Sequence, residues 1–184
     1  MVPEAELRPT NGGVEPAGEG WFVLNARDAK WLDGHFGAYT RFEGRPHARF
    51  PQLGINIGVL APGQAACMYH GEDEQEDFLV LQGECLLLIE GEERRLKQWD
   101  FVHCPPWTEH VFVGAGDGPC SLLAVGTRSD GDVVYPGSEL ALKHKAGVEQ
   151  ETRDPDEAYA GVPGDQPVGY KPGWLPGAEQ PATR

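Results

Sequence analysis

The feature that most constrains the fold is a series of short apolar runs, each ended by turn-forming residues. Between residues 21 and 126 these runs recur without the 3.6-residue apolar repeat of a long helix. Turns such as Pro62-Gly63 and Pro105-Pro106 separate them. Short strands at this spacing predict an antiparallel all-β sandwich or barrel. The runs are WFVLN (21–25), FGAYTRF (36–42), LGINIGVL (53–60), ACMYHGE (66–72), DFLVLQG (77–83), CLLLIEG (85–91), RRLKQWDFV (94–102), HVFVG (110–114) and SLLAVG (121–126).

The chain length of 184 residues fits one domain with less regular ends. We expect a β domain over residues 21–128. Residues 1–20 carry three prolines and few large apolar groups, which predicts a flexible leader that folds late or not at all. Residues 129–184 are rich in Pro and Gly, which predicts an extended tail. Two short helices are expected there, one capped by Ser138 and one beginning at Asp154-Pro155.

The charge balance excludes several classes of partner. Acidic residues outnumber basic ones 29 to 15, for a formal charge of -14 that repels nucleic acid and anionic membrane surfaces. The start of the chain lacks the pattern of a signal peptide, and no 18 apolar residues run together. We therefore expect a cytoplasmic protein with a small-molecule ligand or substrate. The four cysteines form no CxxC pair, which favours buried free thiols.

Two segments place metal-ligating side chains together. If 66–72 is a strand, His70 and Glu72 lie on the same face, because residues two apart share a face. Glu76 opens the next run, which is apolar on both faces, so its charge needs compensation there. His110 begins another apolar run just after a double-proline turn. Imidazole and carboxylate donors from these runs predict a mixed nitrogen and oxygen metal site.

These two segments resemble the motifs of the cupin superfamily. PGQAACMYHGEDEQEDFLVLQGE resembles the first motif, HxH…E…G after a Pro-Gly turn, and WDFVHCPPWTEH resembles the second, GDxxxxPxGxxH. The metal-binding positions of the family fall on His70, Glu72, Glu76 and His110. The resemblance implies a small antiparallel jelly-roll β-barrel, one divalent metal ion and a homodimer.

The sequence departs from the family pattern at three positions. Glu72 stands where a second histidine is usual, which favours Mn, Fe or Zn over copper. If Glu72 points outward, a site of two histidines and one carboxylate is left. Trp99 and Trp107 replace glycines; we expect Trp99 to pack in the core, and Trp107 either to fit its turn or to reshape the mouth of the cavity.

Two functions remain open from the sequence, and a third possibility is a barrel with no metal, in which the motif carboxylates are protonated or bind water. The first is a metal-dependent enzyme acting on a small molecule in the barrel, with Tyr39, Phe78, Phe112 and Trp107 as candidate lining residues. The second is a non-catalytic cupin that binds a sugar or other small polar ligand and holds a structural metal. No nucleophilic triad, phosphate loop or dinucleotide fingerprint is present in the sequence. Because one fold hosts many reactions, the resemblance does not choose between these functions.

Overall fold

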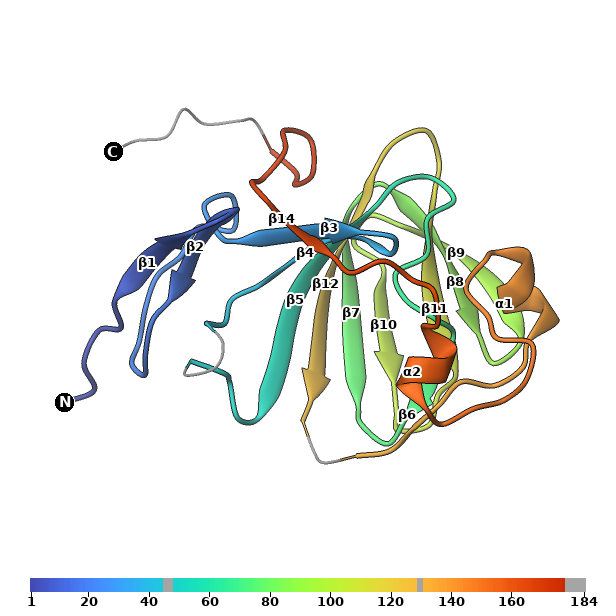
Figure 1. Cartoon of the computed structure of the whole chain (residues 1–184). Coiled ribbons are helices and arrows are strands. Elements are labelled where there is room, and N and C mark those ends of the chain that lie inside the picture. Colours follow the sequence, from blue (N-terminus) through green and yellow to red (C-terminus); the bar gives the residue numbers. More distant parts are fainter. Residues whose placement is uncertain (45–47, 129–130, 178–184) are drawn as a thin grey trace.

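The computed structural model describes residues 1–44, 48–128 and 131–177, and most of its regular structure is β (Figure 1). The strands are β1 (Leu7–Thr10), β2 (Gly13–Pro16), β3 (Trp31–Gly34), β4 (Gly37–Arg41), β5 (Leu53–Leu60), β6 (Gly71–Glu72), β7 (Glu76–Gln82), β8 (Glu84–Ile89), β9 (Glu92–Lys97), β10 (Phe101–Cys104), β11 (His110–Ala115), β12 (Cys120–Thr127), β13 (Val133–Val134) and β14 (Gln166–Val168). The two helices are α1 (Glu139–Lys143) and α2 (Pro155–Ala158). The predicted all-β class is confirmed.

Two antiparallel sheets form the body of the domain. The larger sheet has the order β10-β7-β12-β5-β4-β3-β14, and the smaller has the order β11-β8-β9. Side chains from both sheets meet in one buried cluster, which includes Phe78 and Leu122 of the larger sheet and Leu87 and Phe112 of the smaller. Two sheets packed in this way are consistent with the predicted jelly roll.

Along β5, small and polar residues alternate with apolar ones, so the two kinds lie on opposite faces of the larger sheet. In β5, Gly54, Asn56 and Gly58 point toward the smaller sheet, while Ile57 and Val59 point the other way and pack in a separate cluster. The register of the large sheet then aligns Arg41, Asn56, Ala124 and Phe78 in one row across four strands. Two residues further along the strands, on the same face, the next row contains Gly54, Gly126 and Glu76.

The outer face of the smaller sheet is covered by the segment around α1. Ala141 and Ala146 pack against Leu88 and Val111 in a second buried cluster. The helix begins where the sequence predicts, because the Ser138 hydroxyl accepts a hydrogen bond from the Ala141 amide at 3.2 Å. The second predicted helix is also present, with Asp154 as its N-cap.

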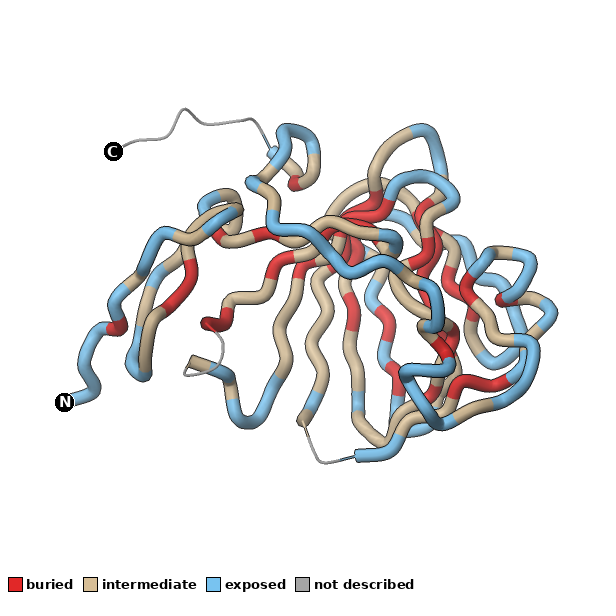
Figure 2. Tube along the Cα trace, viewed as in Figure 1, coloured by how far each residue is buried: buried red, intermediate tan, exposed pale blue. Residues whose placement is uncertain are grey.

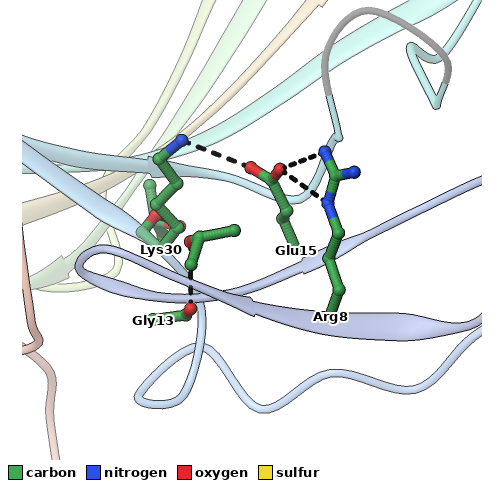
Figure 3. Close-up of polar contacts among 6 residues, drawn as sticks. Arg8, Gly13, Glu15 and Lys30 are labelled. Atoms are coloured by element: carbon green, nitrogen blue, oxygen red, sulfur yellow. Dashed lines mark hydrogen bonds and ion pairs between the residues drawn. The ribbon is translucent and has the colours of Figure 1, made fainter.

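The first 20 residues are more regular than the predicted flexible leader. They form the β1–β2 hairpin, which lies beside the large sheet at the end away from α1 (Figure 1). Glu15 of this hairpin is buried and binds both Arg8 and Lys30, at 2.8 and 3.3 Å (Figure 3). Lys30 belongs to the segment that leads into β3, so this contact ties the hairpin to the domain.

Several predicted strands need correction. Residues 21–25 form no strand apart from an isolated bridge at Trp21, and the run 94–102 is divided between β9 and β10. Trp99 lies in the turn between these two strands with 64% of its surface exposed, so the expectation that it packs in the core is wrong. Its φ of 74° is a left-handed conformation that glycine adopts most easily, which fits the glycine usual at this motif position.

Residues 131–177 return to the body of the domain. β14 adds to the edge of the large sheet by pairing with β3. Val168, Tyr170, Trp174 and Leu175 then pack against the outer face around Trp31. Within the described ranges, no helix has both the length and the apolar character needed to cross a membrane. The domain limits, the cytoplasmic location and the homodimer stay predictions.

Candidate metal centre

The structure brings together three of the four predicted metal ligands. His70 and His110 form an antiparallel bridge, with backbone hydrogen bonds of 3.2 and 2.8 Å between them. Their rings lie on the same side, and the ring centroids are 5.2 Å apart. Glu76 opens β7 opposite them, and one ligand atom from each of the three residues lies within 4.8 Å of the others.

Backbone carbonyls orient both imidazoles. Nδ1 of His70 lies 2.8 Å from the carbonyl oxygen of Met68, and Nδ1 of His110 lies 3.0 Å from that of Thr108. Because a carbonyl only accepts, each Nδ1 carries the hydrogen in these contacts. In a neutral ring the Nε2 atom then carries no hydrogen and has a free lone pair, which is the arrangement found in metal-binding histidines.

Glu76 supplies an oxygen that lacks a hydrogen bond. Its Oε2 atom is buried and has no hydrogen-bond partner among the described residues, although it lies 3.2 Å from Nε2 of His110. Two lone pairs facing each other at this distance require a proton or a cation between them. This orphaned oxygen, together with the two free imidazole nitrogens, fits a divalent metal ion.

The charges of these groups respond to one another. Burial and the neighbouring His110 lower the pKa of His70. Burial by itself opposes ionisation of both Glu76 and His110, but the contact between them lowers the pKa of Glu76 and raises that of His110. The contact with His110 therefore favours the ionised form of Glu76 inside the domain, and a carboxylate there also stabilises a bound metal ion.

Glu72 lies beside the three-residue group but does not belong to it. Among the described residues, the atoms close enough to share an ion come from His70, Glu76 and His110. Glu72 is half-buried in β6, and burial followed by repulsion from Glu76 raises its pKa to about 7. Its role as a fourth ligand stays a prediction.

The turn before His110 accommodates the unusual Trp107. This residue has a φ of 70°, again the conformation that glycine favours, and its amide donates to the carbonyl of Glu72 at 2.6 Å. Its side chain is 46% exposed and lies under the guanidinium of Arg153. Trp107 thus fits its turn, and it is absent from the lining of the cavity described next.

A cavity of about 480 Å³ lies between the two sheets next to the three-residue group. Tyr39, Phe78 and Phe112 line it, as the sequence predicts. A second hollow of about 260 Å³, lined by Glu72 and Glu76, adjoins it. Arg41, Asn56 and Ala124 line both, so the hollow at Glu76 is continuous with the apolar cavity.

Arg41 and Asn56 of this site were not predicted from the sequence. Both lie on inward-facing positions, and they are opposite each other on β4 and β5. The signal was present in LGINIGVL, where Gly54, Asn56 and Gly58 alternate with Ile and Val. A strand with one apolar face and one face of glycine and a polar residue indicates a cavity wall instead of a packed core.

Comparison with known proteins supports the same architecture. Residues 56–126 match the family described as the cupin domain. The chain carries a cupin domain. The match begins in β5 and ends in β12, so it contains the segments that supply His70, Glu76 and His110. No protein of established annotation matches the chain in sequence.

Several solved structures are similar to this chain. A cupin-superfamily sugar phosphate isomerase from Silicibacter pomeroyi aligns at 24% identity with a TM-score of 0.47, over 59% of this chain and 66% of its own. The polyketide cyclase RemF from Streptomyces resistomycificus aligns at 15% identity with a TM-score of 0.50, over 58% and 79%. A cupin 2 conserved barrel domain protein from Salinispora arenicola aligns at 22% identity with a TM-score of 0.48, over 62% and 92%.

These likenesses concern the fold. The alignment spans just under two thirds of the isomerase chain, and every identity is below 25%. The reaction of any of these proteins is therefore not transferred to the cupin domain described here.

Proposed function

We propose that the cupin domain holds one divalent metal ion through His70, Glu76 and His110 and acts as a metal-dependent enzyme on a small molecule in its cavity. The observation that carries this proposal is the unpartnered Oε2 of Glu76 facing the free Nε2 of His110 at 3.2 Å. A metal ion bound there would polarise an oxygen of the bound molecule.

The chain's own residues contribute positioning and exclusion of water. The carbonyls of Met68 and Thr108 fix the two rings, so their nitrogens converge without a further change of rotamer. The tilted rings of Phe78 and Phe112 pack against one another beside the three-residue group, with centroids 4.6 Å apart, and exclude water from that side. The adjoining cavity leaves an approach for the ligand.

Three protein donors favour catalysis over a structural role. A structural ion is usually closed off by four protein ligands, whereas catalytic ions keep a position open for water or substrate. The ligand atoms close enough to share an ion come from three of the described residues, and this group borders a cavity. Manganese, iron and zinc are all compatible with two imidazoles and a carboxylate.

Metal content tests the proposal. Protein purified without added metal, or reconstituted with Mn, Fe or Zn, is expected to bind about one equivalent of ion, as a single three-ligand site requires. His110→Ala and Glu76→Gln should lose it. Asp77→Asn and His103→Ala are matched controls, because these residues lie next to Glu76 in sequence or register but pair with each other instead.

Less than about a tenth of an equivalent in every preparation would contradict the proposal. A second measurement separates catalysis from a structural metal. Mn²⁺ bound with an open position should enhance the relaxation of water protons, whereas an ion closed off from solvent should not. No enhancement at full occupancy would favour the non-catalytic alternative.

A further inference from the structure

The cavity of the cupin domain differs chemically from end to end. Its wall is largely apolar and includes Leu60, Phe78, Phe112 and Leu122. Arg41 and Asn56 lie at the edge shared with the hollow around Glu76, where they face each other on β4 and β5. Asp165 lines the cavity away from that edge and accepts a hydrogen bond from the Tyr39 hydroxyl at 2.9 Å. A volume of about 480 Å³ falls in the range that small-molecule ligands occupy.

Arg41 has a positive charge without a carboxylate partner among the described residues. Its guanidinium lies 4.9 Å from the ring centroid of Tyr39. Glu15 and Glu43, which line a small hollow together with Arg41, are already paired, Glu15 with Arg8 and Lys30, and Glu43 with Arg128. The charge of Arg41 is thus available to an anion in the cavity.

Asn56 leaves a hydrogen-bonding position open in the same row. Its side-chain oxygen is buried and has no hydrogen-bond partner within the described part of the chain. A buried amide oxygen without a donor is costly, and a ligand hydroxyl or N–H beside the anionic group would satisfy it.

Gly58 leaves space for the body of a ligand. It lies two residues after Asn56 in β5, between its strand partners Tyr39 and Leu122. A Cβ atom added there would meet no atom within 4 Å, although the residue lies in the middle of a strand. The absent side chain therefore belongs to the volume of the cavity.

The spacing between these groups sets the size of the ligand. Arg41 and Phe78 are three strand steps apart in one row, and neighbouring strands lie about 4.8 Å apart, so their Cα atoms are separated by roughly 14 Å. Glu76 is in the next row. The side chain of Arg41 extends into the space between these two Cα atoms, and the distance left from its guanidinium to Phe78 matches the length of a small acid.

We propose that the cavity binds a small carboxylic acid with an aromatic or branched hydrocarbon body and a hydroxyl or N–H group beside the carboxylate. The carboxylate binds the guanidinium of Arg41, the neighbouring donor binds Asn56, and the body lies over Gly58 against Phe78 and Phe112. This inference rests on the proposed function, because it takes the three-residue group and the cavity as one site. The apolar wall disfavours a sugar phosphate, which is polar over its whole surface.

Calorimetric titration tests the ligand class. The probes are 3-phenyllactate, mandelate and 2-hydroxyisocaproate, with 3-phenyllactamide as the uncharged match and glucose 6-phosphate as the competing class. We expect saturable binding of at least one hydroxy acid, and affinity for the amide lower by at least about tenfold, the usual size of a charged hydrogen bond.

Two variants locate the binding. Arg41→Met should lower the affinity for the hydroxy acid by at least about tenfold, and Arg41→Lys should retain part of that affinity. Gly58→Val should abolish binding by filling the cavity while leaving the fold intact, because the strand favours valine and the added atoms meet free space. Gly169→Val is the matched control, since it also has open space around it but lies outside the cavity lining.

Metal content measured on the same samples separates the two proposals. Bound metal with no binding of any hydroxy acid, or with binding unaffected by Arg41→Met and Gly58→Val, overturns the ligand class and leaves the metal site intact. Binding of glucose 6-phosphate in preference to the hydroxy acids overturns it as well. Binding with the expected variant effects but without metal supports the ligand class and counts against the proposed function alone.

Discussion

The two faces of the large sheet are built from the same strands but are used in opposite ways. On the outer face, Trp31, Ile57 and Val59 pack against the returning tail, and Trp31 has no exposed surface. On the inner face, the alternate positions of β5 are Gly54, Asn56 and Gly58, and part of that face stays hollow. The strand ends bordering the hollow, in β5 and β12, are also only partly buried (Figure 2).

This difference indicates where the stability and the function of the domain reside. Burial of apolar area stabilises a fold in proportion to the area removed from water, so the packed outer face contributes most to stability. The inner face combines a cavity, an orphaned carboxylate oxygen and an amide oxygen without a partner, each of which costs stability. Local features that cost stability are typical of functional sites.

The largest expected effect lies on the outer face. Trp31→Ala should lower the free energy of unfolding by about 3–5 kcal/mol, the range for removal of a buried large aromatic. It removes ring contacts with Tyr170 and Trp174 and the hydrogen bond from the indole to the carbonyl of Ala26. Denaturant unfolding measures the change. The exposed Trp99→Ala is the control, and a loss below about 1 kcal/mol for Trp31→Ala would contradict this view of the outer face.

The second-largest expected effect is stabilisation of the domain by a metal ion bound at the inner face. A metal ion at about 100 times its dissociation constant should raise the free energy of unfolding by about 2.7 kcal/mol, because it binds only the folded chain. Glu76→Gln should remove this gain, and Asp77→Asn, on the opposite face of the same strand, should keep it. Thermal unfolding with and without metal measures both. Equal stabilisation of the two variants would place the ion elsewhere.

The smallest effect compares one polar group on each face. The hydroxyl of Thr40 points outward, is fully buried and donates to the carbonyl of Lys30 at 2.8 Å, so Thr40→Val should cost about 1 kcal/mol. The amide oxygen of Asn56 points inward without a partner, so Asn56→Leu should be neutral or stabilising by up to about 1 kcal/mol. Urea unfolding of both variants decides this point. A clear loss in Asn56→Leu would show that the amide already supports the fold.

Much of the fold was predictable because strand alternation and turn chemistry are local. The run LGINIGVL coincides with β5, and the helix after Ser138 begins at its predicted cap. The β1–β2 hairpin was not predicted, because its stability comes from contacts of Glu15 with Lys30 and of the hairpin with the sheet, which composition does not reveal. The exposed position of Trp99 was missed for a related reason, since side-chain size predicted burial while the turn required a left-handed backbone.

The candidate site was predictable in its ligands and less so in its surroundings. His70, Glu76 and His110 follow from the spacing of the two motifs, whereas the position of Glu72 depends on how β6 lies against β13. The alternation in LGINIGVL already marks Asn56, but only strand register places it and Arg41 in one row with Ala124 and Phe78. Register between strands far apart in sequence is not contained in any single run.

The most direct test of the account is anomalous diffraction from crystals of the metal-loaded protein, recorded at the absorption edge of the ion. The account predicts one strong peak within bonding distance of Nε2 of His70, Nε2 of His110 and the carboxylate of Glu76, and none in crystals of Glu76→Gln. A loaded protein whose only anomalous peaks lie away from these three side chains would contradict it.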